Sequence, residues 1–169
     1  ALAHQVGSEV VYSEIARLIG LDAKTVSNYI DVLEQAYVVF RLTSFSRNLR
    51  NEIKTNRKIY FYDNGVRNAA ISALQPISTR NDIGALWENF LVSERMKKLS
   101  YEKDYAAYYF WRTKQQQEID YLEEKDGKIT GYEFKWNPNR KVRIPKTFTE
   151  TYNAQVQVIT KENFRDFIE

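Results

Sequence analysis

The sequence predicts an α/β (α+β) protein in two parts, with helices dominating the first part and strands the second. Two observations support this fold class. Apolar residues recur at helical spacing through residues 10–37, whereas residues 105–136 hold three β-branched and aromatic runs that are separated by short polar turns. The polar, proline-containing stretch 75–81 lies between two helical patterns. We therefore expect one domain over residues 1–78 and a second over residues 79–169.

Composition is typical of a folded protein and excludes cysteine chemistry. Of the 169 residues, 43% are hydrophobic and 28% are charged, which argues against a disordered chain. The absence of cysteine excludes disulfides, thiolate metal sites and cysteine nucleophiles, and it fits a cytoplasmic setting. The single histidine, His4, makes a His-based triad unexpected. No apolar run approaches the ~20 residues of a membrane helix, so we expect no membrane span.

The chain begins at Ala1, without an initiator methionine and without a signal-peptide pattern. We therefore expect a piece of a longer protein.

The first part opens with the pattern of a helix-turn-helix. Residues 10–20 predict a short amphipathic helix that begins with Ser13 as its N-cap and ends at Gly20. Asp22 can cap the longer helix that follows and runs to about Tyr37. The exposed face near the start of this second helix carries polar side chains of the kind that contact bases or phosphates. These candidate DNA-binding residues are Lys24, Thr25, Ser27 and Asn28.

Two strand-like runs, 38–45 and 58–63, follow the helices and are joined by a basic stretch. Two helices and a hairpin with a basic loop make a winged helix. The net charge is only +3, so the clustering of positive charge in this loop is what indicates a nucleic-acid footprint. A solvated loop, or a wing that contacts other proteins, is the alternative. The candidate DNA-binding residues here are Arg47, Arg50, Lys54 and Arg57.

Asp63 precedes a short helical pattern after the second run, and we expect it to act as an N-cap rather than a functional acid.

The second part is predicted to run in the order αβββαβ. Its expected segments are a long helix over 81–100, strands over 105–112, 117–124 and 128–136, a short helix over 146–154 and a strand over 154–160. A second basic cluster lies at the end of the third of these strands and in the loop after it. This cluster is a nucleic-acid footprint or a solvated loop, and it consists of Lys135, Arg140, Lys141, Arg143 and Lys146.

Charged side chains on two neighbouring strands form the candidate catalytic site. Strand alternation puts Glu118 and Asp120 on one face of their strand, and it does the same for Glu133 and Lys135 on the next. If the hairpin between these strands pairs in register, Asp120, Glu133 and Lys135 can converge. Two carboxylates can hold Mg²⁺ or Mn²⁺, which activates a water, while the lysine stabilises developing negative charge. We therefore predict Asp120, Glu133 and Lys135 as catalytic residues.

A further carboxylate is available on the long helix. Glu88 lies in an apolar stretch, where an acid is costly without a partner, so we predict Glu88, Asp120 and Glu133 as metal ligands. The alternative is that the pairs Glu133–Lys135 and Arg112–Glu118 are only ion pairs of the sheet.

These features together resemble the PD-(D/E)xK nuclease core, the fold of restriction endonucleases and Holliday-junction resolvases. The resemblance rests on Asp120, on Glu133 and Lys135 after a hairpin, on the mid-helix Glu88, and on the αβββαβ order. Ile119 stands where the family's name has proline. The resemblance implies a restriction-endonuclease-like core after the winged helix.

Taken along the chain, the sequence resembles one family in particular, the uncharacterised C-terminal domain of prokaryotic AAA-family P-loop ATPases. The winged helix is followed in order by YFYDNG, GALWENFLVSE, YYFWR, EIDYL and YEFKW. The resemblance implies DNA binding, a metal-dependent nuclease activity, and an N-terminal P-loop ATPase domain as partner. A catalytically silent regulatory or protein-interaction module is the alternative. No G-x-x-x-x-G-K-[ST] motif occurs, so we expect no ATP site in this chain.

Overall fold

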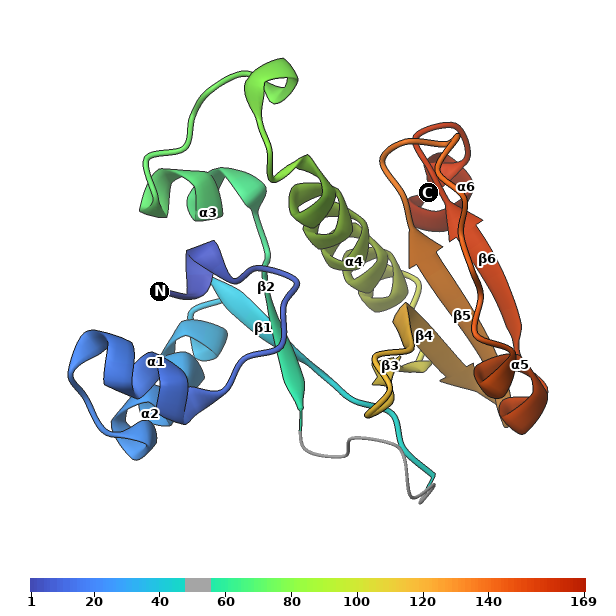
Figure 1. Cartoon of the computed structure of the whole chain (residues 1–169), viewed down its shortest axis with the longest axis horizontal. Helices are drawn as coiled ribbons and strands as arrows, with labels where there is room; N and C mark the ends of the chain where they lie inside the picture. The colour runs from blue at the N-terminus through green and yellow to red at the C-terminus, as the bar shows by residue number, and fades with distance from the viewer. Residues whose placement is uncertain (48–55) are drawn as a thin grey trace. The chain divides into compact units, whose positions relative to one another are not determined.

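The computed structural model describes residues 1–47 and 56–169 (Figure 1), so the predicted wing residues Arg50 and Lys54 lie outside the described residues. The chain forms two compact units. Unit 1 consists of Ala1–Leu42 and Asn56–Ser93, and unit 2 consists of Thr43–Thr55 and Glu94–Glu169. Helices and strands occur together in the described residues, which confirms the α/β class. None of the helices within the described ranges combines the length and apolar character that a bilayer crossing requires.

The first elements agree with the predicted order of two helices and a strand pair. They are the 3₁₀ turn η1 (Leu2–His4), α1 (Tyr12–Ile19), α2 (Ala23–Gln35), β1 (Val39–Thr43), β2 (Arg57–Phe61), α3 (Asn64–Ala70) and the 3₁₀ turn η2 (Ile77–Thr79). The strands β1 and β2 pair in a two-stranded sheet. The helices pack on this pair through a buried cluster that includes Ile15, Val26, Ile30, Val39 and Ile59.

Local capping chemistry explains where these helices start and stop. Gly20 ends α1 in the left-handed conformation with a φ of 72°. The carboxylates of Asp22 and Asp63 accept bonds from the N–H groups of Thr25 and Val66, both at 2.9 Å, so both are N-caps as predicted. The expected cap at Ser13 is wrong, because α1 has its N-cap at Val11, without a side-chain cap bond.

The remaining elements follow the predicted helix and strand order. They are α4 (Ile83–Tyr101), β3 (Ala107–Arg112), β4 (Glu118–Lys125), β5 (Lys128–Phe134), α5 (Lys146–Tyr152), β6 (Gln155–Ile159) and α6 (Phe164–Ile168). The last four strands form one sheet in the order β3-β4-β5-β6. The first two pairings are antiparallel, and the pairing of β5 with β6 is parallel, with α5 in the crossover.

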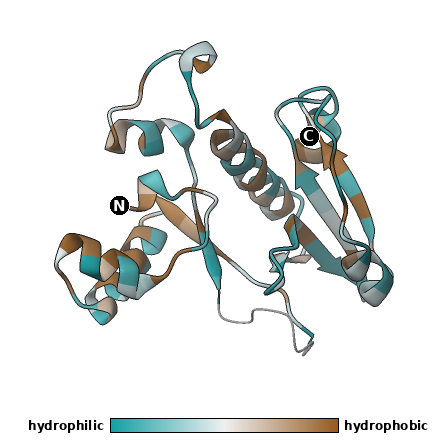
Figure 2. Cartoon of the chain, in the orientation of Figure 1, coloured by the Kyte–Doolittle hydropathy of each residue, from teal (hydrophilic) through white to brown (hydrophobic). Residues whose placement is uncertain are grey.

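Apolar side chains cover both faces of the four-stranded sheet. One cluster joins Trp111, Ile119 and Phe148 to Phe45, which comes from the segment after β1. On the other side, Phe167 of α6 packs its ring 4.7 Å from that of Tyr132. By contrast, Figure 2 shows the segment between β5 and α5 as mostly hydrophilic. Residues of this polar segment line a pocket within unit 2.

Candidate active site

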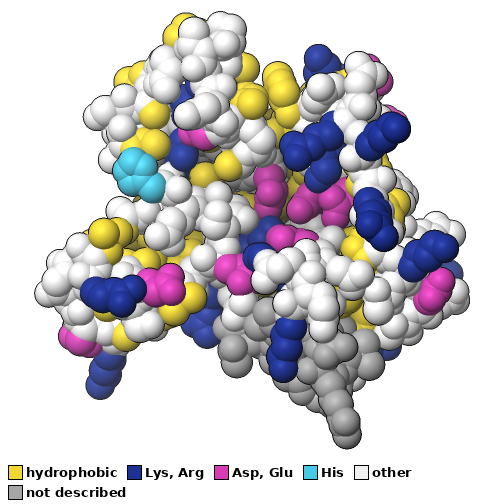
Figure 3. Space-filling view, viewed as in Figure 1, with side chains coloured by type: hydrophobic (Ala, Val, Ile, Leu, Met, Phe, Trp, Pro, Cys, Tyr) yellow, Lys and Arg dark blue, Asp and Glu magenta, His cyan; other side chains and the backbone are white. Residues whose placement is uncertain are grey.

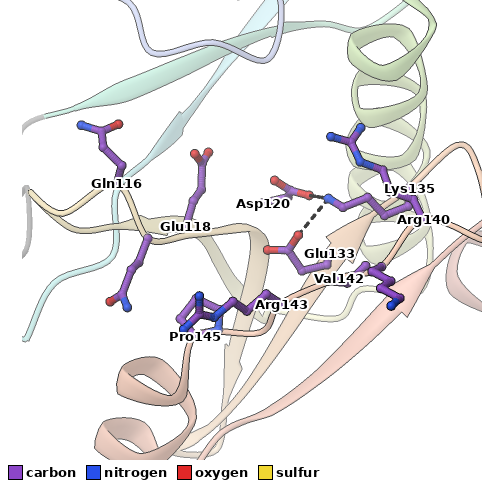
Figure 4. Close-up of a pocket in the computed structure, with 11 residues that line it drawn as sticks. Gln116, Glu118, Asp120, Glu133, Lys135, Arg140, Val142, Arg143 and Pro145 are labelled. Carbon is purple, nitrogen blue, oxygen red and sulfur yellow. Dashed lines mark hydrogen bonds and ion pairs between the residues drawn. The ribbon is translucent and has the colours of Figure 1, made fainter.

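Asp120, Glu133 and Lys135 come together where the β4–β5 ladder ends. The regular pairing closes with Tyr121 opposite Tyr132, and Asp120 and Glu133 are the next residues on each strand. The Nζ of Lys135 lies 2.9 Å from Oε2 of Glu133 and 3.5 Å from Oδ2 of Asp120 (Figure 4). The hairpin register therefore produces the convergence that strand alternation allows, while the chemical roles of the three residues stay predictions.

A bulge in β4 sets the position of Asp120. On β3, two steps lead from Tyr109 to Trp111, but their partners Leu122 and Ile119 on β4 are three steps apart. The extra residue therefore lies in the stretch that contains Asp120. The Oδ2 atom of Asp120 accepts a hydrogen bond of 2.8 Å from the N–H of Phe134. The carboxylate is thus fixed by the backbone of the neighbouring strand.

The cluster is largely shielded from water. Side-chain exposure is 15% for Asp120, 10% for Glu133 and 21% for Lys135. Burial, reinforced by the negative charge of Asp120, raises the pKa of Glu133 to about 7 despite the opposing effect of Lys135. For Lys135, burial disfavours the charged form, but the two carboxylates outweigh it and raise the pKa. The site therefore holds more negative charge than one lysine compensates.

These three side chains lie in a pocket of about 470 Å³ that is formed within unit 2. Gln116 and Glu118 line the pocket on the side of β4, and Arg140, Lys141 and Arg143 line it from the segment after β5. Figure 3 shows Lys and Arg side chains gathered over that segment. The pocket thus combines a carboxylate pair with a basic border.

Glu118 is compensated within its own sheet. Its Oε2 lies 3.8 Å from a guanidinium nitrogen of Arg112 on β3, so the predicted cross-strand ion pair is present. Asp120 and Glu133, by contrast, both form an ion pair with the same cation, Lys135.

Glu88 has polar partners within unit 1. Its Oε1 accepts hydrogen bonds from Lys58 Nζ at 3.0 Å and from the Tyr60 hydroxyl at 2.6 Å. The Lys58 side chain is only 3% exposed, so this pair supplies the partner that a mid-helix acid needs. Within the described residues, no group of three or more acidic or histidine side chains could hold a metal ion. The role of Glu88 as a third metal ligand stays a prediction.

The predicted DNA-binding residues of α2 differ in their surroundings. Lys24 and Asn28 are exposed, and Ser27 is half-buried. The Thr25 hydroxyl donates a 2.6 Å hydrogen bond to Asp22 and so forms part of the helix cap. Lys24 and Asn28 are therefore the pair that this face leaves most accessible.

The described residues of the predicted wing, Arg47 and Arg57, also have neighbours. The Arg57 guanidinium lies 4.9 Å from the centre of the Tyr12 ring within unit 1. Arg47 belongs to unit 2, where it forms an ion pair with Glu124 and lies over the ring of Phe45. The basic stretch after β1 thus contributes residues to both units.

Sequence reasoning did not assign the basic border to the site. The available signal was proximity in the sequence, because a cluster of basic residues follows Lys135 within ten positions. It contains Arg140, Lys141 and Arg143. Gln116 gave no comparable signal, because a glutamine run after a strand is also typical of an ordinary turn.

Comparison with known proteins identifies two domains of unknown function. Residues 1–78 match "Domain of unknown function (DUF8612)", and residues 83–167 match "Domain of unknown function (DUF4143)". Two curated relatives are "Uncharacterized protein Rv2008c" of Mycobacterium tuberculosis and "Uncharacterized protein Mb2031c" of Mycobacterium bovis. Each is 31% identical over 136 residues, which cover 79% of this chain and 30% of the relative.

The chain therefore spans about a third of the length of these relatives. No solved structure matches it. The match over residues 83–167 extends over half of the chain and contains Asp120, Glu133 and Lys135. The chain thus belongs to the family of the domain of unknown function DUF4143.

Proposed function

We propose that this chain binds DNA and hydrolyses its phosphodiester bonds with Mg²⁺ or Mn²⁺, as the C-terminal part of an AAA-family P-loop ATPase. The observation that carries the proposal is the meeting of Asp120, Glu133 and Lys135 in a polar pocket bordered by positive charge. Sites for phosphoryl chemistry combine hard oxygen ligands with cations that stabilise the charge of the phosphate.

The donor set fits a small divalent cation. Magnesium is commonly bound through one or two carboxylates, with water and substrate oxygens completing its shell. Asp120 and Glu133 supply two such carboxylates, and the raised pKa of Glu133, about 7, reflects negative charge that a further cation would stabilise. The bound cation would polarise the phosphate and lower the pKa of a water.

The protein's own groups then have separate tasks. Asp120 is oriented by the N–H of Phe134, and Glu133 completes the oxygen pair. Lys135 is charged and within hydrogen-bond reach of Glu133, so its ammonium group can stabilise negative charge that develops on the phosphate. The surrounding burial strengthens each of these electrostatic interactions.

The ATPase part of the proposal rests on the resemblance along the chain and on length. The curated relatives are about three times as long as the region they share with this chain. That remaining length is ample for a nucleotide-binding domain, which typically needs 100–200 residues.

Calorimetric titration with Mg²⁺ and with Mn²⁺ tests the metal site. We expect binding to the wild type and its loss in Asp120→Asn, which removes a ligand charge while keeping the shape. The matched control is Asp126→Asn on the exposed β4–β5 turn, which should bind like the wild type. Unchanged metal binding and unchanged DNA cleavage in Asp120→Asn would refute the assignment.

A catalytically silent docking module is the second candidate, and a feature of unit 1 favours it. An apolar pocket of about 410 Å³ is lined by side chains of α1, α2 and α3 that include Ile19, Leu33 and Val66. Apolar pockets of this size are typical of binding sites. Wild-type protein that neither binds metal nor cleaves DNA, but alters the ATPase rate of the parent enzyme, would favour this candidate.

A further inference from the structure

Three cations on the border of the unit 2 pocket have side chains without a polar partner among the described residues. Arg140, Lys141 and Arg143 are exposed, and within the described part of the chain their side chains form no hydrogen bond or ion pair. Some other basic residues of the unit are paired, such as Arg95 with Glu123 and Arg112 with Glu118. The border therefore carries positive charge that is available to a ligand.

The chain anchors this basic segment at both ends. At its start, the N–H of Lys135 donates to the carbonyl of Ile159 at 2.9 Å, which continues the contact with β6. At its end, the carbonyl of Pro145 accepts from the N–H of Phe148 at 3.1 Å, and the ring of Phe148 is fully buried. A backbone bond from Arg140 to Asn137 forms a turn between them. The cations are thus held beside the pocket.

Two of the cations lie on opposite sides of the carboxylate pair. In the view of Figure 4, the guanidinium of Arg140 lies beyond Lys135, whereas that of Arg143 lies beyond Glu133, towards Pro145. The carboxylates of Asp120 and Glu133 lie between them. In this view, a ligand that engages both arginines spans the carboxylate pair.

We infer that Arg140 and Arg143 hold the phosphates on either side of the phosphate that meets Asp120 and Glu133, so that one DNA strand runs across the pocket. This inference rests on the proposed function, which supplies the position of the central phosphate. Arginine is suited to the task because its planar donors bind phosphate oxygens in pairs. Lys141 adds a further charge to the same border.

The spacing of charge favours a polynucleotide over a small phosphate ester. A nucleotide with one phosphate presents a single charged group, whereas a strand presents a negative charge at every residue and so offers a separate phosphate to each arginine. Contacts to phosphate fix the register of a strand without reading its sequence. The two arginines therefore act as positioning residues.

Binding of a fluorescent DNA duplex of 20 base pairs, measured by anisotropy in EDTA between 50 and 200 mM salt, tests the inference. We expect each of Arg140→Gln and Arg143→Gln to weaken binding about tenfold at 0.1 M salt, and to reduce the log–log salt slope by about 0.9. Lys128→Gln, an exposed cation at the start of β5, is the matched control and should leave both quantities unchanged.

Metal titration separates this inference from the proposed function. Both arginine variants should bind Mg²⁺ like the wild type, because Asp120 and Glu133 are intact. If the wild type neither binds metal nor cleaves DNA while the arginine variants still lose affinity, the strand contact stands and the nuclease proposal fails. Unchanged DNA affinity and an unchanged salt slope in both arginine variants would overturn the inference. An equal loss of DNA affinity in Lys128→Gln would also overturn it. So would binding of polyglutamate, an anionic polymer without phosphate, by the wild type as tightly as DNA.

Discussion

The ammonium group of Lys135 lies 2.9 Å from Oε2 of Glu133, two residues earlier in the chain, and yet the pKa of Glu133 is raised to about 7. The lysine alone would lower that pKa. Burial and the nearby charge of Asp120 outweigh it, and they therefore dominate the electrostatics of the site.

A prediction about pH follows from this balance. Because the folded pKa of Glu133 lies above the unfolded value of 4.5, ionising the carboxyl costs stability, and this cost grows as the pH rises from about 4.5 to 7. Glu133→Gln should therefore gain about 1–3 kcal/mol relative to the wild type between pH 5 and pH 8. Urea unfolding at both pH values measures the difference. Asp126→Asn is the control and should follow the wild type. If the unfolding free energy of Glu133→Gln changes with pH in the same way as that of the wild type, the prediction is wrong.

The pair of Glu88 and Lys58 supports a second prediction. Removing the carboxylate in Glu88→Ala leaves the buried ammonium of Lys58 without this partner, which should cost about 3–5 kcal/mol of unfolding free energy. The double variant Glu88→Ala with Lys58→Met should recover part of the loss. Chemical denaturation gives both values, and a metal titration of Glu88→Gln tests in parallel whether Glu88 also contributes to metal affinity. A neutral effect of Glu88→Ala on stability would show that the pair is not structural.

Gly131 on β5 provides a third prediction, about packing. A Cβ at this position would lie 3.1 Å from methyl carbons of Ile119 and Val156, and 3.2 Å from the ring of Phe148. Gly131→Ala should therefore destabilise the protein by about 1–3 kcal/mol through overpacking. Gly84→Ala is the contrasting variant, because nothing lies within 4 Å of a Cβ there. In α4 it should stabilise by about 0.5–1 kcal/mol. Thermal unfolding measures the stability of both variants relative to the wild type. A Gly131→Ala variant as stable as the wild type would show that β5 can shift to accommodate the methyl group.

The sequence predicts features of the fold that depend on neighbouring residues. Asp22 and Asp63 cap helices because their carboxylates accept hydrogen bonds from nearby backbone N–H groups. Gly20 ends α1 because a residue without a side chain adopts the left-handed conformation readily. The hairpin that joins β4 to β5 follows from the turn at Asp126 and Gly127, whose positive φ angles such residues tolerate. This register brings Asp120 close to Glu133, and the bulge in β4 then sets the position of the Asp120 carboxylate.

Features that depend on distant partners could not be predicted in the same way. Arg47 is part of a local charge cluster in the sequence, but its carboxylate partner is Glu124, 77 positions later. Glu88 was recognisable as an acid in need of a partner, although nothing in the sequence identifies Lys58 as that partner. The bulge near Asp120 left no mark either, since an extra residue in one strand appears only when both strands are paired.

The segment after β1 has a consequence for how these domains are inherited. The chain enters unit 2 at Thr43, returns to unit 1 at Asn56 and leaves it again after Ser93. Phe45 from this excursion packs its ring 5.4 Å from that of Tyr109 and 5.2 Å from that of Tyr152. A gene rearrangement that transferred only the C-terminal half to another protein would separate unit 2 from Phe45 and its ring contacts. The backbone passes from unit 1 to unit 2, back to unit 1 and again to unit 2. We therefore expect evolution to transmit the two units together, as one continuous gene segment.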